Sequence, residues 1–186
     1  RGLGDVYKRQ GFNTHCNDGN KARFGFCDNI PSQSCQPDDN DDSDRAIGIG
    51  LAGQSGTSAS AGVQGYSSQD LYGTSLQFSV YVEVEQTPWI KVMQAKAGDN
   101  TFRYTSDVWT TANTYSANNG ATFKNDYFNT LATNRVKVCT NNDAKCYTYN
   151  LPSSWGKLTM LELTSGTPGT RQTKDMDMAA WEDVMG

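Results

Sequence analysis

An acidic run at residues 38–44 is the densest cluster of charge in the sequence. Its potential oxygen ligands alternate with other residues: Asp38, Asn40, Asp42 and Asp44. A loop with this spacing can turn several side-chain oxygens toward one hard cation, and Ca²⁺ prefers oxygen ligands at about 2.3–2.6 Å. The run is not an EF-hand loop, because it lacks the glycine and the final glutamate of that motif. It predicts a Ca²⁺ site of another kind, with a solvated acidic loop as the alternative.

Two glutamates provide a second candidate chemistry. Glu83 and Glu85 lie in an alternating segment, so in a strand they share one face, about 6.5–7 Å apart. Paired carboxylates can hydrolyse glycosidic bonds, which makes a β-rich polysaccharide hydrolase or lyase one functional hypothesis. The sequence lacks the E-x-D-x-E arrangement of sandwich-fold glycosidases, and it has a single histidine, His15, on which to build a nucleophilic triad. The simpler interpretation is two solvent-facing glutamates, and we expect no catalysis.

Aromatic residues form the third group, with 9 Tyr, 7 Phe and 4 Trp in the chain. Aromatic side chains with a polar edge suit sugar stacking as well as core packing. We assign Trp89 and Trp181 to the core. Tyr66 and Tyr115 lie in segments rich in Asn, Gly and Ser, and we predict that these two tyrosines contact a ligand.

The five cysteines indicate the compartment. None forms a C-x-x-C pair, which disfavours a zinc ribbon or a thioredoxin-type motif. Cys139 and Cys146 bracket a turn rich in Asn and Asp between two β-like runs, which predicts a hairpin closed by a disulfide. Cys27 and Cys35 bracket a second short loop that a disulfide could close. Cys16 is then left over, which indicates a partner outside this sequence or a different pairing. Because disulfides are typical of secreted and cell-surface proteins, we predict an extracellular location; five reduced thiols are the alternative.

Length and composition limit the class of protein. The chain has 186 residues, with 36% apolar residues, 19% charged residues and a net charge of −4. This length suits one domain of ordinary size. Few charges and many Gly, Asn, Ser and Thr residues suit a loop-rich β protein better than a helical bundle. The sequence carries no basic stripe and no apolar run near the roughly 18 residues of a membrane span, so we expect neither a nucleic-acid partner nor a membrane span.

Hydrophobic periodicity predicts mainly strands, which cover residues 46–53, 76–85, 89–95, 134–139 and 146–150. In residues 46–53, small residues alternate with branched ones, as in a strand whose backbone lies close to another backbone. Residues 54–65 are rich in Ser, Gly and Ala, and we expect a flexible loop or linker there. Two short helices are predicted near the C-terminus, at residues 153–163 and 175–185. The predicted fold is therefore β-rich α+β with antiparallel sheets.

The chain divides into three parts. Residues 1–10 differ in composition from the rest, and we interpret them as an adapter-derived segment or a linker. Residues 11–65 form a cysteine-bearing half that contains the acidic run. Residues 66–186 form a Trp-rich β half that ends in the two helices. We expect the two halves to make one domain, or two half-domains that are exchanged between neighbouring chains.

Several motifs resemble those of fibrinogen-related domains in extracellular-matrix proteins. The W-I-K-V-M-Q run at Trp89, the T-F-R-Y-T-S-D-V-W-T run at Thr101 and the N-T-Y run at Asn113 are similar to that family in order and spacing. The K-N-D-Y-F-N-T run at Lys124 and the helical segments near the C-terminus follow in the same order. The family glycines before the first Trp are missing, and E-Q-T-P, beginning at Glu85, stands in their place.

A second portion of the chain also resembles this family, but in a rotated order. Cys16-Asn17, the R-F-G-F run at Arg23, Cys35 and the D-S-D-R-A-I-G-I-G run at Asp42 are similar to a portion that follows the C-terminal helix in the family. Here this portion precedes the Trp89 motif. The rotation is expected if the chain spans the second half of one repeat followed by the first half of the next.

The resemblance implies a disulfide-bonded, β-rich extracellular module. Many such domains bind glycans or acetylated groups, often beside a Ca²⁺ site, and others are structural. We therefore predict a secreted, non-catalytic adhesion, matrix or glycan-binding module whose partners are glycans or matrix proteins. The rotated order predicts head-to-tail self-association, as a repeat or filament subunit. A calcium-dependent lectin and the polysaccharide hydrolase or lyase are the alternatives.

Overall fold

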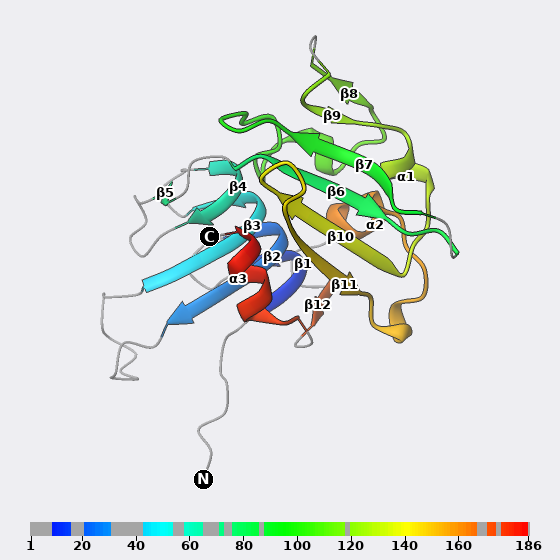
Figure 1. The fold of residues 1–186 in the computed structure, drawn as a ribbon. Coiled ribbons are helices and arrows are strands. Elements are labelled where there is room, and N and C mark those ends of the chain that lie inside the picture. Colours follow the sequence, from blue (N-terminus) through cyan, green and yellow to red (C-terminus); the bar gives the residue numbers. More distant parts are fainter. Residues whose placement is uncertain are drawn as a thin grey trace.

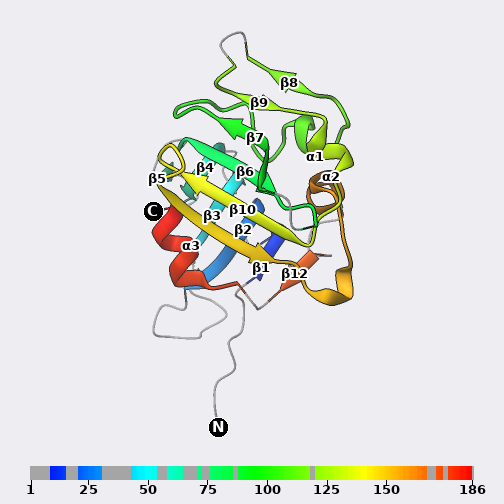
Figure 2. The same cartoon turned by 45° about the vertical axis from the view of Figure 1, so that its right-hand side comes forward.

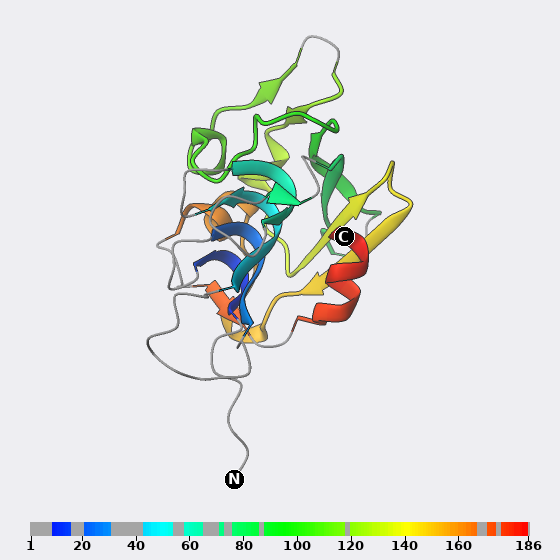
Figure 3. The same ribbon diagram turned by 90° about the vertical axis from the view of Figure 1, so that its left-hand side faces the viewer.

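The computed structural model describes residues 9–15, 21–30, 43–53, 58–64, 71–72, 76–85, 88–117, 120–166, 171–173 and 176–185. These residues form two six-stranded sheets with short helices at their margins (Figure 1). The side view of Figure 3 shows the sheets as two layers. All strand pairs between named strands are antiparallel. This arrangement confirms the predicted β-rich α+β fold.

Sheet A comes mostly from the first part of the chain. Its strand order is β12 (Arg171–Thr173), β1 (Arg9–His15), β2 (Lys21–Ile30), β3 (Ser43–Ala52), β4 (Ser58–Gln64) and β5 (Leu71–Tyr72). Strands β1 to β5 pair in chain order, whereas β12 arrives from near the C-terminus and pairs with β1. Sheet A therefore combines strands β1 to β5 with β12, which lies about 100 residues further along the chain.

Sheet B comes from the middle of the chain. Its strand order is β11 (Lys145–Asn150), β10 (Arg135–Thr140), β6 (Phe78–Val82), β7 (Ile90–Ala95), β9 (Phe123–Lys124) and β8 (Tyr115–Ser116). The strands predicted at residues 76–85 and 89–95 correspond to β6 and β7, and the predicted hairpin is β10–β11. Strand β6 ends at Val82, so Glu83 and Glu85 follow the strand rather than share one of its faces. Figure 2 shows this hairpin beside β6, with which β10 pairs.

The helices are short: α1 (Tyr127–Thr130), α2 (Met160–Ser165), α3 (Met178–Met185) and the single 3₁₀ turns η1 (Asp107–Trp109) and η2 (Ser153–Trp155). Helix α3 is the helix predicted at residues 175–185, whereas α2 overlaps only the end of the helix predicted at residues 153–163. At the start of α3, the Asp177 carboxylate accepts a hydrogen bond of 3.1 Å from the Ala180 N–H. This contact is the N-terminal cap that an aspartate supplies.

The helix predicted at residues 153–163 is wrong over its first part. Gly156, with a φ of 68°, ends the η2 turn, and Leu158 then exchanges two backbone hydrogen bonds of 2.9 Å with Thr133. Helix α2 begins only after Thr159, whose hydroxyl accepts a hydrogen bond of 3.1 Å from the Glu162 N–H. The Glu162 carboxylate accepts one of 2.8 Å from the Thr159 N–H in return. This capping box, rather than the apolar spacing, sets the start of the helix.

The loop or linker predicted at residues 54–65 is wrong over residues 58–64, which form the internal strand β4, and the remaining residues of the predicted loop lie outside the described part of the chain. The small side chains of β4 are buried: Ala59, Ser60 and Ala61. The Ser60 hydroxyl accepts a hydrogen bond of 3.1 Å from the Phe102 N–H, which links β4 to the segment between β7 and η1. A segment rich in Ser, Gly and Ala can be a flexible linker or a closely packed strand, and composition does not distinguish the two.

Four glycines face one another across sheet A: Gly11, Gly25, Gly48 and Gly62. Their φ angles lie between 114° and 154°, a range that side-chain-bearing residues rarely adopt. A Cβ atom on Gly48 would overlap the carbonyl oxygen of Phe24 and lie 2.9 Å from the Cα of Gly25. The close backbone approach predicted for residues 46–53 is therefore confirmed.

Side chains from both sheets form one hydrophobic core. Sheet A contributes Phe12, Phe24, Ile47, Ile49 and Ala61, and sheet B contributes Val80, Val82, Val136 and Val138. Trp181 of α3 joins the two contributions, because its ring centroid lies 4.8 Å from that of Phe24 and 5.1 Å from that of Tyr147. Its indole N–H donates a hydrogen bond of 3.2 Å to the Ile47 carbonyl. Trp181 is fully buried, as predicted, and the two halves share a core within one chain.

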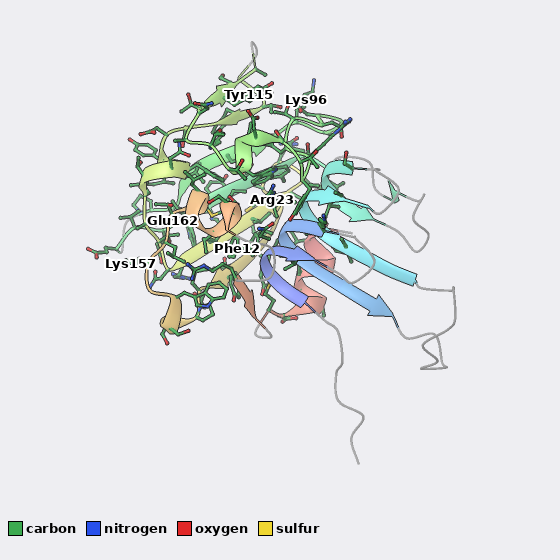
Figure 4. The ribbon with its side chains drawn as sticks, turned by 180° about the vertical axis from the view of Figure 1, so that it is seen from behind. Phe12, Arg23, Lys96, Tyr115, Lys157 and Glu162 are labelled. Carbon is green, nitrogen blue, oxygen red and sulfur yellow. A yellow bond between two sulfur atoms is a disulfide. The ribbon has the colours of Figure 1, made fainter. Side chains whose placement is uncertain are left out.

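Arg23 is a buried cation that ties sheet A to two distant segments. Its Nε and Nη2 atoms donate hydrogen bonds of 2.9 and 2.7 Å to the Tyr104 carbonyl, and its Nη1 donates one of 2.7 Å to the Thr164 carbonyl in α2. Its guanidinium lies 4.1 Å from the centroid of the Tyr104 ring. Arg23 is buried, and Figure 4 shows it well away from the exposed Lys157. Buried charge is tolerated here because its donors are used by carbonyl groups.

Lys124 is the second buried cation, with no exposed surface. Its Nζ donates hydrogen bonds of 2.7 Å to the Val108 carbonyl and 2.5 Å to the Thr111 carbonyl, and it lies 4.7 Å from the centroid of the Phe128 ring. Burial removes water from the ammonium and lowers the pKa of Lys124 from 10.5 to about 8, although Asp107 opposes this effect. Lys124 therefore holds the segment around η1 against β9 and α1.

We expect Lys124 to make stability depend on pH above neutrality. Below about pH 8 both folded and unfolded chains hold the Lys124 proton, whereas between pH 8 and 10.5 the folded chain releases it first. Urea titration gives the free energy of unfolding of the wild type and of Lys124→Met at each pH. The difference, wild type minus variant, should rise by about 1–3 kcal/mol from pH 8 to pH 10. The same difference for Lys157→Met, at an exposed position, should stay flat. A pH-independent difference for Lys124→Met would contradict the lowered pKa.

Candidate functional site on the outer face of sheet B

The central strand of sheet B turns apolar residues inward and polar residues outward. Val80 and Val82 of β6 are fully buried, whereas Tyr81 between them is half-buried on the opposite face. The strand register places Tyr81 directly opposite Lys137 on β10 and Lys91 on β7. Residues opposite one another on neighbouring strands lie within side-chain contact. A tyrosine is thus flanked by two lysines on the outer face.

A β-bulge in β7 sets which of its side chains reach this face. The register with β6 shifts between Val80 and Tyr81, so Val92 has no direct partner on β6. Val92 and Met93 are consecutive, yet both are fully buried. Lys91, on the other side of the bulge, extends outward and donates a hydrogen bond of 2.9 Å to the Gln94 side chain. The bulge therefore keeps the core filled while it aims Lys91 at the outer face.

Lys137 lies between two aromatic rings. Its Nζ is 4.6 Å from the centroid of Tyr81 and 4.8 Å from the centroid of Trp89. Cation–π contacts of this kind contribute about 0.5–1 kcal/mol at exposed sites. Among the residues that the structure describes, Lys137 has no hydrogen-bond or ion-pair partner. Partial burial lowers the pKa of Lys137, although the Asp143 charge opposes this.

Arg135 also lies beside Trp89. Its guanidinium carbon is 5.2 Å from the Trp89 centroid, and its Nη1 donates hydrogen bonds of 2.9 and 2.7 Å to the two Glu83 oxygens. Its Nε donates one of 3.0 Å to the Asn150 side chain. Arg135 is therefore held in one orientation, with its charge already neutralised by Glu83. We call Tyr81, Trp89, Lys91, Arg135 and Lys137 the aromatic–cationic face.

The turn of the β10–β11 hairpin folds over one end of this face. Asn141, Asn142 and Asp143 have φ angles of 52°, 55° and 67°, a left-handed conformation that Asn and Asp tolerate better than most residues. The Asp143 carboxylate accepts hydrogen bonds of 2.6 Å from the Tyr81 hydroxyl and 3.2 Å from Lys91 Nζ. Burial would raise the pKa of Asp143, but these hydrogen bonds outweigh it and hold the pKa below its usual value.

A disulfide joins Cys139 and Cys146 at the base of this turn. The two residues are direct partners in the register of β10 and β11. Cys139 is buried and Cys146 is exposed, at the point where the hairpin meets the outer face. The cross-link therefore fixes the short turn that carries Asp143.

The core assignment of Trp89 is wrong. Trp89 is half-buried on the outer face, packed beside Arg135 and Lys137 rather than among the core side chains. The sequence contains a signal for this position, because Trp89 and Lys91 share one face of an alternating strand whereas Ile90 and Val92 share the other. The hydrophobicity of a tryptophan predicts a core position, whereas the alternation of residues 89–92 predicts the outer face.

Tyr115, predicted to contact a ligand, lies in β8 far from this face. It is half-buried, and its ring packs edge-on against Phe102 with centroids 6.1 Å apart. Its hydroxyl accepts a hydrogen bond of 3.4 Å from Thr101. Figure 4 shows Tyr115 at one end of the molecule near Lys96, and remote from Phe12. The structure does not bring Tyr115 together with the aromatic–cationic face.

The remaining predicted positions fall mostly outside the described residues. These positions are Asp38, Asn40, Asp42, Tyr66 and Cys35. Asp44 lies in β3 and Cys27 lies in β2, and the structure describes only the backbone of these two residues. Over the described residues there is no group of three His, Cys, Asp or Glu side chains that could hold a metal ion. The predicted Ca²⁺ site and the Cys27–Cys35 disulfide therefore stay predictions.

The two glutamates considered for catalysis have separate basic partners. Glu83 forms its ion pair with Arg135 at 2.7 Å, whereas the exposed Glu85 forms one with Lys157. The Lys157 charge and hydrogen bond lower the pKa of Glu85. Hydrolysis of a glycosidic bond calls for one carboxyl group that can donate a proton. Two carboxylates that are each neutralised by a base favour structural ion pairs.

The fold and this face define a two-sheet, β-rich α+β protein that presents aromatic rings and cations on the outer side of one sheet. None of the described helices lies across β6 and β10 on that side (Figure 1). Comparisons with family models, curated proteins and solved structures found no match to the chain. The helices in the described part of the chain are all too short to span a lipid bilayer.

Proposed function

We propose that the protein is a secreted, non-catalytic adhesion or matrix module that binds glycans through the aromatic–cationic face. The observation that carries this proposal is Lys137, an ammonium held 4.6 and 4.8 Å from two aromatic rings with no partner of its own among the described residues. Sugar rings present apolar C–H faces and polar hydroxyl edges. A surface that pairs aromatic rings with fixed hydrogen-bonding groups complements both.

The side chains of the face are fixed by contacts within the protein, and this order supports a role of the face in ligand binding. The two ion pairs, Arg135 with Glu83 and Lys91 with Asp143, fix the side chains around Trp89 and Tyr81. A surface that is already ordered loses less conformational entropy when a ligand binds. The Cys139–Cys146 disulfide supports the secreted location, because such bonds persist in oxidising compartments. The resemblance to fibrinogen-related domains points to the same extracellular role.

The test is glycan binding by a matched pair of aromatic variants. Wild-type protein, Trp89→Ala and Tyr127→Ala are titrated with a panel of oligosaccharides by isothermal calorimetry. Tyr127 is an exposed aromatic on α1 that is not one of the five residues of the face, and so serves as the control. We expect Trp89→Ala to weaken binding at least tenfold and Tyr127→Ala to leave it unchanged. Circular dichroism confirms that each variant is folded.

Two results would contradict the proposal. One is the absence of any glycan binding by folded wild-type protein, and the other is undiminished binding by Trp89→Ala. Release of reducing sugar from a bound polysaccharide would favour the hydrolase instead. Binding that disappears with EDTA would favour a calcium-dependent lectin. Binding that persists with EDTA would show that the face binds glycans without a metal ion.

Head-to-tail self-association is a second part of the proposal. It rests on the rotated order of the family-like portions. Since both halves already share one core within a single chain, association would use surface contacts rather than exchange of halves. Light scattering at two concentrations tests this, and a strictly monomeric species at the higher concentration would rule it out.

A further inference from the structure

We propose that the aromatic–cationic face selects glycans that carry an anionic group, a carboxylate or a sulfate, and that this group binds at Lys137 while a sugar ring contacts Trp89. This inference rests on the proposed function and names its ligand class. The chemistry shared by the two anions is a set of oxygen acceptors with a full negative charge. Lysine recognises such groups as a compact point charge.

The charge of the face differs in sign from that of the chain. Three cations, Lys91, Arg135 and Lys137, lie around two carboxylates, Glu83 and Asp143. The face therefore has one surplus positive charge, whereas the whole chain has a net charge of −4. Each carboxylate is already paired, Glu83 with Arg135 and Asp143 with Lys91. The surplus charge resides on Lys137.

Lys137 is also the cation that gains most from an added anion. Its ammonium lies 4.6 Å from the Tyr81 centroid and 4.8 Å from the Trp89 centroid, and the side chain is half-buried, so it is partly removed from water. Burial lowers the pKa of Lys137, which means that its charged form is under-stabilised where it lies. An incoming carboxylate or sulfate supplies the missing opposite charge and charge-assisted hydrogen bonds.

Asp143 shows that this face already holds a carboxylate. Its oxygen accepts hydrogen bonds from the Tyr81 hydroxyl at 2.6 Å and from Lys91 Nζ at 3.2 Å, next to Lys137. The disulfide-bonded hairpin fixes it there. A ligand anion at Lys137 would lie close to Asp143 and be repelled by it. Asp143 therefore weakens anion binding and sets a limit on the charge that the face accepts.

The same features favour a glycan over a nucleic acid. Nucleic-acid binding draws most of its affinity from many neutralised phosphates, and it calls for a basic stripe. This face offers one surplus charge beside two carboxylates. One anionic substituent on a stacked ring suits that arrangement better than a run of phosphates.

The experiment compares acidic and neutral forms of one oligosaccharide. Wild-type protein is titrated with an oligogalacturonate, with its methyl ester, with a sulfated oligosaccharide and with single-stranded DNA. The variants are Lys137→Gln, Asp143→Asn and, as control, Lys96→Gln. Lys96 is exposed, follows the end of β7 and is not one of the five residues of the face. Asp143→Asn keeps an oxygen for the Tyr81 hydrogen bond but removes the charge.

We expect the oligogalacturonate to bind at least tenfold more tightly than its ester. Lys137→Gln should remove that advantage, Lys96→Gln should keep it, and Asp143→Asn should raise affinity for the acid three- to tenfold. The gain in Asp143→Asn cannot come from misfolding. Affinity for the acid should fall as salt is added, because the charges lie at the surface. The titration with the sulfated oligosaccharide shows whether the face binds sulfate as well as carboxylate.

The outcomes separate this inference from the proposed function. Equal binding of the acid and its ester through Trp89 would overturn the anion preference and leave glycan binding in place. Undiminished binding of the acid by Lys137→Gln would also overturn it. If folded wild-type protein binds none of the sugars, the proposed function fails as well. DNA binding as tight as that of the acidic sugars would replace the glycan with a nucleic acid.

Discussion

Gly48→Ala should destabilise the protein by about 4 kcal/mol or more, a large fraction of the roughly 5–15 kcal/mol that a domain of ordinary stability possesses. The reason is the paired glycines in sheet A. An alanine Cβ at position 48 would overlap the Phe24 carbonyl oxygen and approach the Gly25 Cα to 2.9 Å. Both contacts are backbone atoms, so relief requires β2 and β3 to separate. The φ of 151° at Gly48 adds strain of its own.

Urea denaturation followed by tryptophan fluorescence measures this effect, and Gly98→Ala is the matched control. Gly98 also has a positive φ, of 76°, but a Cβ there would meet nothing within 4 Å. The control should cost about 1–2 kcal/mol through its backbone conformation. Equal losses in the two variants would mean that the close approach of β2 and β3 is wrong. A loss several-fold larger in Gly48→Ala would assign the difference to the clash.

Arg23→Met should have the second-largest effect, a loss of about 3–5 kcal/mol. Methionine fills much of the same space but supplies no donors. The Tyr104 carbonyl would then lose two hydrogen bonds and the Thr164 carbonyl one, all from buried groups. The contact between the guanidinium and the Tyr104 ring would weaken as well. Sheet A and helix α2 would lose the hydrogen bond between Arg23 and Thr164.

Thermal unfolding compares Arg23→Met with Arg103→Met and with Arg23→Lys. Arg103 is an exposed arginine one residue before Tyr104, so its variant should unfold within about 0.5 kcal/mol of wild type. Lysine at position 23 keeps the charge but not the planar set of donors, and we expect it to recover less than half of the loss. Full recovery with lysine would show that charge, rather than donor geometry, holds the segments together.

Local patterns carried most of the fold prediction. Alternation in residues 76–85 gave β6, with Val80 and Val82 inward and Tyr81 outward, because strand side chains point alternately to opposite faces. The small and branched residues of 46–53 gave a close-packed strand, and the Asn- and Asp-rich turn gave the β10–β11 hairpin. These features depend on residues that are close together in the sequence, so they can be predicted without knowing which segments pair in the fold.

The aromatic–cationic face depends on partners that are far apart in sequence. Tyr81, Lys91 and Lys137 meet because β6 pairs with both β7 and β10, and Asp143 reaches them because the hairpin turn folds back over the sheet. Likewise β4 is a strand, despite its linker-like composition, because β3 and β5 flank it. Pairing between strands is a non-local choice governed by the shared core. Residue spacing along the chain predicts the strands, but it does not specify which strands lie side by side.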